Sequence, residues 1–339
     1  MNSAKEFSAL NSKISSMKKN LLQEEDYESL IGFKKIEEVI DYLYEREFIV
    51  NKNYNSINEI ESDLKKNRLK ILNKLGYFLS KNYNNLVQLI LDKYEIEDIK
   101  KATRNLVTKN KALTKESFII RDDFYEKIKE GITIEEFFEE LKNSKFYKYL
   151  RGYKNQEKRD LLFFVEMSLD RNYYSSIFFE SKYLNKENEK IIKNFYGQFI
   201  DLYNLSWIYR AKKFYNIKPV IIYNYTILGG DLFNTTDIKN LSYMELEDFV
   251  DNILKTKYSF LFDSKHNIDI YMERRINRYL YYQSRDLTKS NKFNFKKTLG
   301  IIVMTDFDIK DIGAILESKN YNLTSEETRG YLIKNLGRS

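Results

Sequence analysis

The sequence predicts an all-helical protein, and three observations lead to this fold class. Only one proline, Pro219, and 11 glycines occur among 339 residues, and these are the residues that interrupt helices most strongly. Long stretches carry apolar residues at spacings of three, four and seven, as expected for one face of an amphipathic helix. Similar helical segments also recur along the chain at nearly equal spacing, which indicates a body built from repeated helical units.

Three pairs of long helices are predicted from the apolar periodicity. The paired segments are 56–79 with 86–106, 157–180 with 189–214, and 267–284 with 293–318. In the first pair the polar stretch NYNN (82–85) is expected to be the turn. A helix of about 20 residues is about 30 Å long, and two such helices joined by a short turn form an antiparallel hairpin. We therefore expect three helical hairpins.

A short helix is predicted before each hairpin. The segments IEEVIDYL (36–43), IEEFFEEL (134–141) and LEDFVDNI (246–253) align without gaps. Their apolar positions coincide, at Val39/Phe137/Phe249, Ile40/Phe138/Val250 and Leu43/Leu141/Ile253. Ser or Thr followed three residues later by Glu has the spacing of a helix capping box, and it occurs at Thr133–Glu136, Ser242–Glu245 and Thr324–Glu327.

A third repeated segment closes each unit. It reads YEIEDIKKATRN at 94–105, IDLYNLSWIYRAK at 200–212 and DFDIKDIGAILESK at 306–319, and it places Asp98, Asn204 and Asp311 at equivalent, almost evenly spaced positions. A polar side chain among apolar neighbours commonly bonds backbone groups of the preceding turn or of an adjacent unit. We interpret Asp98, Asn204, Asp311 and Arg210 as structural positions of the repeat rather than as reactive groups.

The repeats predict three similar domains, at 1–112, 113–218 and 219–339. A period of about 107 residues is too long for a solenoid made of single helical hairpins. Three units of this size are more simply arranged about a pseudo-threefold axis. We therefore predict three pseudo-equivalent helical domains.

The composition lacks the residue types that several classes of catalytic and metal-binding site require. The chain has no Cys and one His, which leaves almost nothing for disulfides, thiol catalysis, zinc sites or Ser/His/Asp triads. Neither GxxxxGK[ST] nor GxGxxG occurs. The 50 Asp and Glu residues always offer carboxylate pairs, but none is distinguished from the others. We expect no catalytic residue, cofactor or metal.

The apolar stretches are too short to cross a membrane. The longest, such as LLFFVEMSL (161–169) and PVIIYNYTIL (219–228), fall well below the ~20 residues that a transmembrane helix needs. The N-terminal residues carry charges throughout and lack the apolar core of a signal peptide. We expect a soluble protein without transmembrane insertion.

The net charge of +7 is unevenly distributed. Residues 271–297 hold eight basic and two acidic side chains, whereas 122–140 hold eight acidic and two basic ones. Two solvated helix faces would explain these runs, and so would two different binding faces. The candidate partner-binding residues are Arg274, Arg275, Arg278, Lys296 and Lys297. Arg and Tyr also alternate in YMERRINRYLYYQSR (271–285), but no nucleic-acid-binding motif accompanies them, so nucleic acid is not an expected partner.

The repeated motifs resemble those of one family. DLYNLSWIYRAKKF (201–214) is similar to the recurring Asp-x-x-Asn-Leu-x-x-Ile-x-Arg-x-Lys pattern of the C subunit of V/A-type rotary ATPases, a relative of the d subunit of the eukaryotic V-type enzyme. YEIEDIKKATRN and FDIKDIGAILESKNYNLTSEETRGYLI resemble the first and last copies of this pattern. The sequence also departs from strict repetition, because Asn204 replaces Asp and Glu317 stands where the other copies have Arg104 and Arg210.

The resemblance implies a funnel-shaped, non-catalytic rotor adapter. Such a protein is a monomer present in one copy per complex, peripheral on the cytoplasmic face of the membrane. It would sit on the proteolipid ring and hold the foot of the central stalk, so that torque passes between ATP hydrolysis or synthesis and proton or sodium translocation. Two other interpretations remain open on the residues alone: a helical-repeat interaction scaffold, and an α-helical enzyme that uses buried carboxylates.

Overall fold

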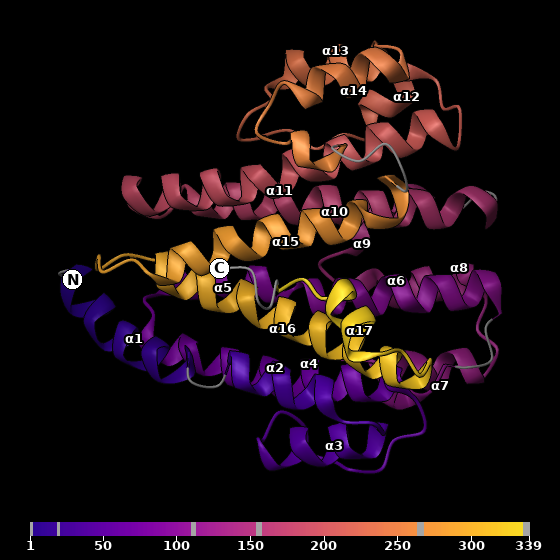
Figure 1. The fold of residues 1–339 in the computed structure, drawn as a ribbon. Helices are drawn as coiled ribbons and strands as arrows, with labels where there is room; N and C mark the ends of the chain where they lie inside the picture. The colour runs from indigo at the N-terminus through magenta and orange to yellow at the C-terminus, as the bar shows by residue number, and fades with distance from the viewer. Residues whose placement is uncertain (1–2, 19–20, 110–112, 154–157, 263–267, 335–339) are drawn as a thin grey trace. The chain divides into compact units, whose positions relative to one another are not determined.

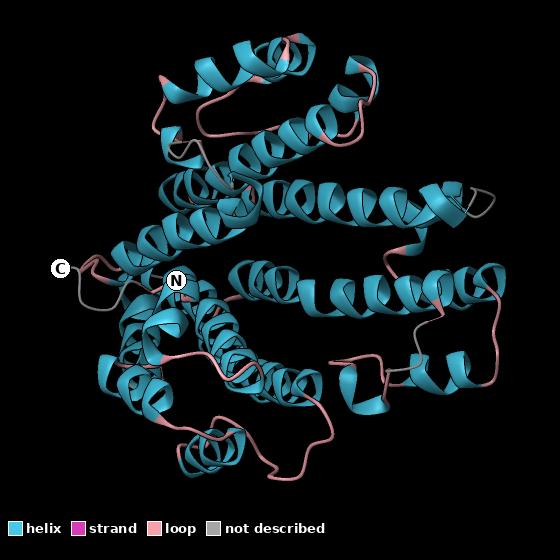
Figure 2. Ribbon diagram, turned by 45° about the vertical axis from the view of Figure 1, so that its right-hand side comes forward, coloured by secondary structure: helices cyan, strands magenta, loops and turns pink. Residues whose placement is uncertain are grey.

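The computed structural model describes residues 3–18, 21–109, 113–153, 158–262 and 268–334. Within these ranges all regular secondary structure is helical and no strand occurs (Figures 1 and 2). The structure thus confirms the predicted all-α fold class. Short 3₁₀ helices, labelled η, connect several of the α-helices.

The first repeat follows an N-terminal helix. That helix is α1 (Ser3–Lys18). The repeat itself comprises α2 (Glu24–Gly32), α3 (Ile36–Glu45), α4 (Ile57–Asn73), η1 (Lys74–Phe78), α5 (Lys81–Leu91) and α6 (Lys93–Thr108). The predicted turn at 82–85 is wrong, because these residues lie in α5. Tyr83 is buried there, so the Asn-rich stretch continues an amphipathic helix. The turn is formed earlier, by η1 and the residues up to Ser80.

The second and third repeats contain the longest helices. The second comprises η2 (Lys115–Ser117), α7 (Asp123–Lys129), α8 (Ile134–Glu140), η3 (Leu141–Asn143), α9 (Tyr147–Leu150), η4 (Arg151–Tyr153), α10 (Lys158–Ser181) and α11 (Lys186–Lys213). The third comprises α12 (Pro219–Asn224), α13 (Thr235–Tyr243), α14 (Leu246–Leu254), η5 (Ser259–Leu261), α15 (Ile268–Thr288), α16 (Lys296–Asn320) and α17 (Ser325–Tyr331). Pro219 opens α12, where its missing N–H costs no helical hydrogen bond.

Two of the three predicted capping boxes are present. Thr133 caps α8 and Thr324 caps α17, each paired with the Glu three residues later. The predicted box at Ser242 is wrong, because its hydroxyl donates to the carbonyl of Ile238 inside α13. Helix α14 instead has Glu245 as its N-cap residue.

The chain divides into two compact units. The first unit comprises residues 1–39, 77–80 and 181–339, and the second comprises 40–76 and 81–180. The units do not follow the boundaries of the sequence repeats, since the last long helix of a repeat packs with short helices of another repeat, as described below. The division into three domains at 1–112, 113–218 and 219–339 stays a prediction.

An aromatic cluster forms the core of the second unit. Phe118, Phe124, Phe137 and Phe138 are fully buried, and the ring of Phe124 meets those of Phe118 and Phe137 edge-on, at centroid distances of 6.2 and 5.0 Å. This geometry is favourable for aromatic pairs. The same cluster includes Ile96, Ile99 and Ala102 of α6. The last helix of the first repeat is therefore packed against α7 and α8 of the second.

In the first unit, α15 and α16 form a close antiparallel hairpin (Figure 1). Gly300 permits this approach. A Cβ atom at this position would lie 2.7 Å from both the Ser284 carbonyl oxygen and the Thr288 Cγ2, closer than real Cβ contacts. Of the nine aligned apolar positions of the short helices, eight are buried and Val250 is half-buried.

Candidate functional site

The three helices that end the repeats, α6, α11 and α16, are called closing helices here. In α6, the carboxylate of Asp98 is fully buried. It accepts backbone hydrogen bonds from Ile119 at 2.9 Å, Ile120 at 2.6 Å and Arg121 at 2.9 Å. These donors immediately precede α7, so a single side chain fixes the start of the second repeat to the end of the first.

Closing helix α11 makes the equivalent connection with two side chains. Asp201 accepts hydrogen bonds from the backbone N–H of Leu232 at 2.7 Å and of Phe233 at 3.3 Å. One turn later, the amide of Asn204 pairs with both backbone groups of Ile227, accepting at 2.8 Å and donating at 2.7 Å. An amide can donate as well as accept, which explains why Asn suits this place, where a carboxylate could not donate.

Closing helix α16 is connected to the N-terminal part of the chain. Asp308 accepts from the backbone N–H of Leu22 at 3.0 Å. Asp311 accepts from the hydroxyl of Tyr27 at 2.9 Å and from the backbone N–H of Ile333 at 2.6 Å. The third closing helix therefore holds the beginning of the first repeat, together with the segment that follows α17.

The donors of the three connections share one register, although the acceptor Asp98 lies one helical turn after Glu95, the residue equivalent to Asp201 and Asp308. Ile120, Leu232 and Leu22 lie equally far along the chain before the aligned segments that begin at 134, 246 and 36, and each donates its N–H to a carboxylate of a closing helix. The order of contacts is cyclic: α6 holds the second repeat, α11 the third and α16 the first. These are the contacts with an adjacent repeat that a structural role requires.

A lysine makes a second contact at the other end of the short helices. Lys212 of α11 donates to the carbonyls of Ser242 and Met244, at 2.7 and 2.5 Å, at the end of α13. Lys319, at the equivalent position of α16, donates to the carbonyl of Ile31 at 2.6 Å, at the end of α2. A carboxylate near the start of a helix and an ammonium at its end both complement the helix dipole.

The buried carboxylates are poorly suited to act as reagents. Asp98, Asp201, Asp308 and Asp311 are at most 2% exposed, and each of them accepts at least one hydrogen bond from a backbone N–H. Burial raises the pKa of Asp98 and of Asp201, while their hydrogen-bond donors act in the opposite direction. A substrate has no access to these groups, so the geometry favours fixing the backbone over acid–base chemistry.

The stabilisation that Asp311 contributes at the contact between α16 and the N-terminal segment depends on pH. Burial raises the pKa of Asp311 from 3.8 to about 6, although the donors Ile333, Lys334 and Tyr27 and the charge of Arg278 act against this. The folded protein therefore holds this proton more tightly than the unfolded chain does. The resulting stabilisation is fully present below about pH 4 and is lost as the pH rises through about 6.

We predict that replacing Asp311 by Asn changes this profile. Between pH 4 and pH 7 the free energy of unfolding of the wild type should fall relative to that of Asp311→Asn by about 2.5 kcal/mol. The full shift corresponds to about 3 kcal/mol at about 1.4 kcal/mol per pKa unit, and part of this change lies below pH 4. Urea unfolding at a series of pH values measures the difference. The control is Asp286→Asn, an exposed carboxylate; a pH-independent difference for Asp311→Asn would contradict the prediction.

The structure divides the predicted partner-binding residues into two groups. Arg274, Arg275 and Arg278 are used within the chain: Arg274 donates to the carbonyl of Gly330, Arg275 to that of Leu261 at 2.9 Å, and Arg278 to those of Leu332 and Ile333 at 2.7 and 3.0 Å. Their guanidinium groups hold backbone carbonyls, most of them in the C-terminal segment, which makes them poor candidates for a partner. Lys296 and Lys297 at the start of α16 are half-buried and face no such carbonyl.

Other sequence predictions have mixed outcomes. Arg210 is exposed and forms no hydrogen bond or ion pair through its side chain with any described residue, so no contact supports a structural role for it. Its equivalent Arg104 does pair with Glu166, at 2.5 Å. Sequence reasoning assigned no role to Asp201, although it begins the quoted Asp-x-x-Asn motif, or to Asp308. Their spacing of three from Asn204 and Asp311 places them on the same helix face, and this was the available signal.

Two other kinds of functional feature, a metal site and a membrane-spanning helix, are absent from the described residues. No group of three His, Asp or Glu side chains among them is arranged to hold a metal ion. Within the same ranges, no helix is long and apolar enough to cross a membrane.

Comparison with known proteins identifies similar chains. The model of the family described as ATP synthase (C/AC39) subunit matches residues 10–331. The C subunit of the A-type ATP synthase of Methanosarcina mazei is 24% identical over 341 residues, covering 95% of this chain and 91% of that protein. The protein of the same name from Methanococcoides burtonii is 21% identical and covers 98% of this chain and 95% of its own length.

Proposed function

Because this chain belongs to the ATP synthase (C/AC39) subunit family, we propose that it is the adapter of a rotary ATPase, seated on the proteolipid ring and holding the foot of the central stalk. It is a non-catalytic subunit of the complex. In this role one copy transmits torque between ATP hydrolysis or synthesis in the head and ion translocation in the ring. It lies on the cytoplasmic face of the membrane.

The observation that carries this proposal is the cyclic order of the repeat contacts. Each closing helix holds the beginning of the next repeat, and α16 returns to the first. Three similar units connected in this order suit a part that is clamped between a rotating shaft and a rotating ring. The same cyclic order supports the predicted arrangement, a funnel of three domains about a pseudo-threefold axis.

The buried joints also suit a part under load. One ion crossing 100 mV carries about 2.3 kcal/mol, so a few ions per step deliver on the order of 5–10 kcal/mol. That is comparable with the whole stability of a domain, roughly 5–15 kcal/mol. A charge-assisted hydrogen bond is stronger than a neutral one. Distributing the load over several carboxylate–backbone joints keeps the strain on each joint small.

The two competing functions find less support. An α-helical enzyme would need accessible carboxylates, whereas Asp98, Asp201 and Asp311 are buried and occupied by backbone donors. A general interaction scaffold would explain the helical repeats. It would not explain a family match over residues 10–331.

A bridging experiment tests the adapter role. Proteolipid rings are immobilised in detergent and incubated with purified central stalk, with or without this chain. We expect the stalk to be retained only when the chain is present, and the chain to bind the ring without the stalk. A control uses the ring with an unrelated basic helical protein. Retention of the stalk on the bare ring, or failure of the chain to bind either partner, would contradict the proposal.

A further inference from the structure

The three helical hairpins end in turns of similar composition. These hairpin turns are residues 74–81 (KLGYFLSK), 181–186 (SKYLNK) and 289–297 (KSNKFNFKK), with two, two and four lysines and no acidic residue. A charge-balanced protein surface normally intersperses both signs. Two of these lysines are paired with acids outside the turns, Lys186 with Glu189 at 3.2 Å and Lys289 with Asp286 at 2.7 Å. The turns themselves carry a net positive charge, which attracts a negatively charged surface.

Each hairpin turn also exposes an aromatic ring. Tyr77 is 89% exposed, Tyr183 is 56% exposed and Phe293 is 55% exposed. Tyr77 and Tyr183 are separated by the same interval as Asp98 and Asn204, so they occupy the same place in their repeats. In the longer third turn the ring lies three positions beyond the equivalent Ser290. Rings that recur where folding gains little from them indicate an interaction surface.

The three rings belong to the same compact unit. Residues 77–80, 181–186 and 289–297 are all part of the first unit. The second and third turns are joined directly: Asn188 accepts a hydrogen bond from the backbone N–H of Phe295 at 2.9 Å, and the amide of Asn294 donates to Glu187 at 2.8 Å. These two turns therefore lie side by side.

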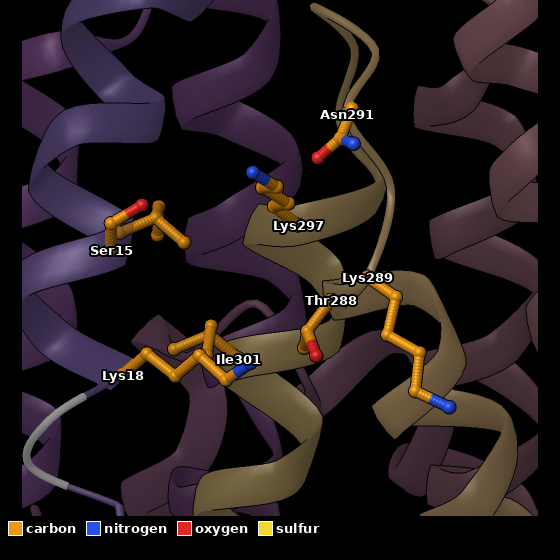
Figure 3. A pocket seen from close by; sticks show the side chains of 8 residues that line it. Ser15, Lys18, Thr288, Lys289, Asn291, Lys297 and Ile301 are labelled. Carbon is orange, nitrogen blue, oxygen red and sulfur yellow. The ribbon is translucent and has the colours of Figure 1, made fainter.

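A cationic cavity lies beside the third turn. It has a volume of about 280 Å³ and is formed by α1, the end of α15 and the start of α16 (Figure 3). Lys18 and Ser15 line one side, and Asn291 and Lys297 line the other. No acidic residue lines the cavity. Lys289 points away from it in Figure 3 and pairs with Asp286 at 2.7 Å.

The two inward lysines have no counter-charge. Neither the Lys18 nor the Lys297 ammonium forms an ion pair or hydrogen bond with any residue that the structure describes. Asn291 adds an amide donor, and the first turn of α16 adds the positive end of a helix dipole. The hydroxyl of Ser15 donates to the carbonyl of Asn11 at 2.8 Å and contributes only an acceptor. This set of donors around a cavity of this size suits a phosphate group.

We propose that the exposed rings of the three hairpin turns, the lysines of the second and third turns and this cavity, which all belong to the first unit and are together called the tip surface, bind the headgroups of an anionic phospholipid membrane. The cavity takes a headgroup phosphate, and the exposed rings enter the interfacial layer. Tyr rings concentrate at the headgroup level of membranes, and lysines near an anionic leaflet strengthen binding additively. Exposed aromatic rings together with a net positive charge are the composition that such a surface needs. The proposal is independent of contacts with the ring or the stalk.

Vesicle co-sedimentation tests the tip surface with the full chain. Vesicles of phosphatidylcholine with phosphatidylglycerol are compared with vesicles of phosphatidylcholine alone. We expect binding only to the anionic vesicles, falling with salt. We also expect an affinity loss of about tenfold or more for Lys18→Gln/Lys297→Gln, and a comparable loss for Tyr77→Ser/Tyr183→Ser/Phe293→Ser.

Matched variants change the same chemistry elsewhere. Lys239→Gln/Lys255→Gln removes two exposed lysines, and Tyr215→Ser/Tyr321→Ser/Tyr331→Ser removes three exposed rings; both should bind vesicles like the wild type. Equal binding by tip and control variants would overturn the proposal. So would pyrophosphate binding in the cavity without vesicle binding, which would assign it to a soluble phosphate. Tip variants that bind vesicles normally but lose the isolated ring would identify a protein contact instead.

Discussion

Replacing Asp98 by Ala is expected to lower the free energy of unfolding of the second unit by about 3 kcal/mol or more. The substitution leaves the backbone N–H groups of Ile119, Ile120 and Arg121 without their acceptor. Each buried and unsatisfied donor costs about 1–3 kcal/mol. Relaxation of the segment before α7 recovers part of this cost, so the individual penalties do not simply add.

Urea unfolding measures the global effect, and amide hydrogen exchange at residues 119–121 measures the local one. The matched control is Glu95→Ala, one turn earlier on α6, where only a partly exposed contact with Arg121 at 3.5 Å is lost. That variant should stay within about 1 kcal/mol of the wild type. An Asp98→Ala protein as stable as the control would show that the carboxylate does not fix the second repeat.

The sequence predicted the helices well where periodicity is long. The segments 157–180 and 189–214 became α10 and α11 with small shifts at their ends, because a long apolar stripe leaves a helix few alternatives. The turn of the first hairpin was misplaced, since Asn-rich composition at 82–85 outweighed the buried position of Tyr83. The composition of a four-residue stretch predicts local structure less well than the tertiary packing of its side chains determines it.

The motif positions were found, but their partners were not. Asp98 and Asp311 were interpreted as structural because they recur among apolar residues. Their partners lie in later segments of the chain, or at Tyr27 in the first repeat, and this pairing depends on tertiary folding and leaves no local mark. The same holds for Arg274, Arg275 and Arg278. A run of positive charge does not reveal that the guanidinium groups bind carbonyls of the chain itself.

Removing this chain from the assembled rotary complex is expected to abolish ATP-driven ion pumping. If the chain has the proposed adapter role, the stalk turns without driving the ring when the chain is absent, so ATP hydrolysis in the head continues and no ion is moved. The effect is larger than that of any point substitution, because it eliminates the mechanical connection rather than weakening it. Asp98→Ala, which loosens one joint, should restore pumping only partly when added back.

The most direct measurement uses complexes reconstituted into vesicles with and without the chain, with ATP hydrolysis and ion uptake followed in the same sample. Probes for both protons and sodium are used, since the proposed role fits either ion. The adapter role predicts hydrolysis in both samples, with ion uptake only when the chain is present and its recovery on adding the purified chain back. Ion uptake of equal rate in the complex that lacks the chain would contradict it.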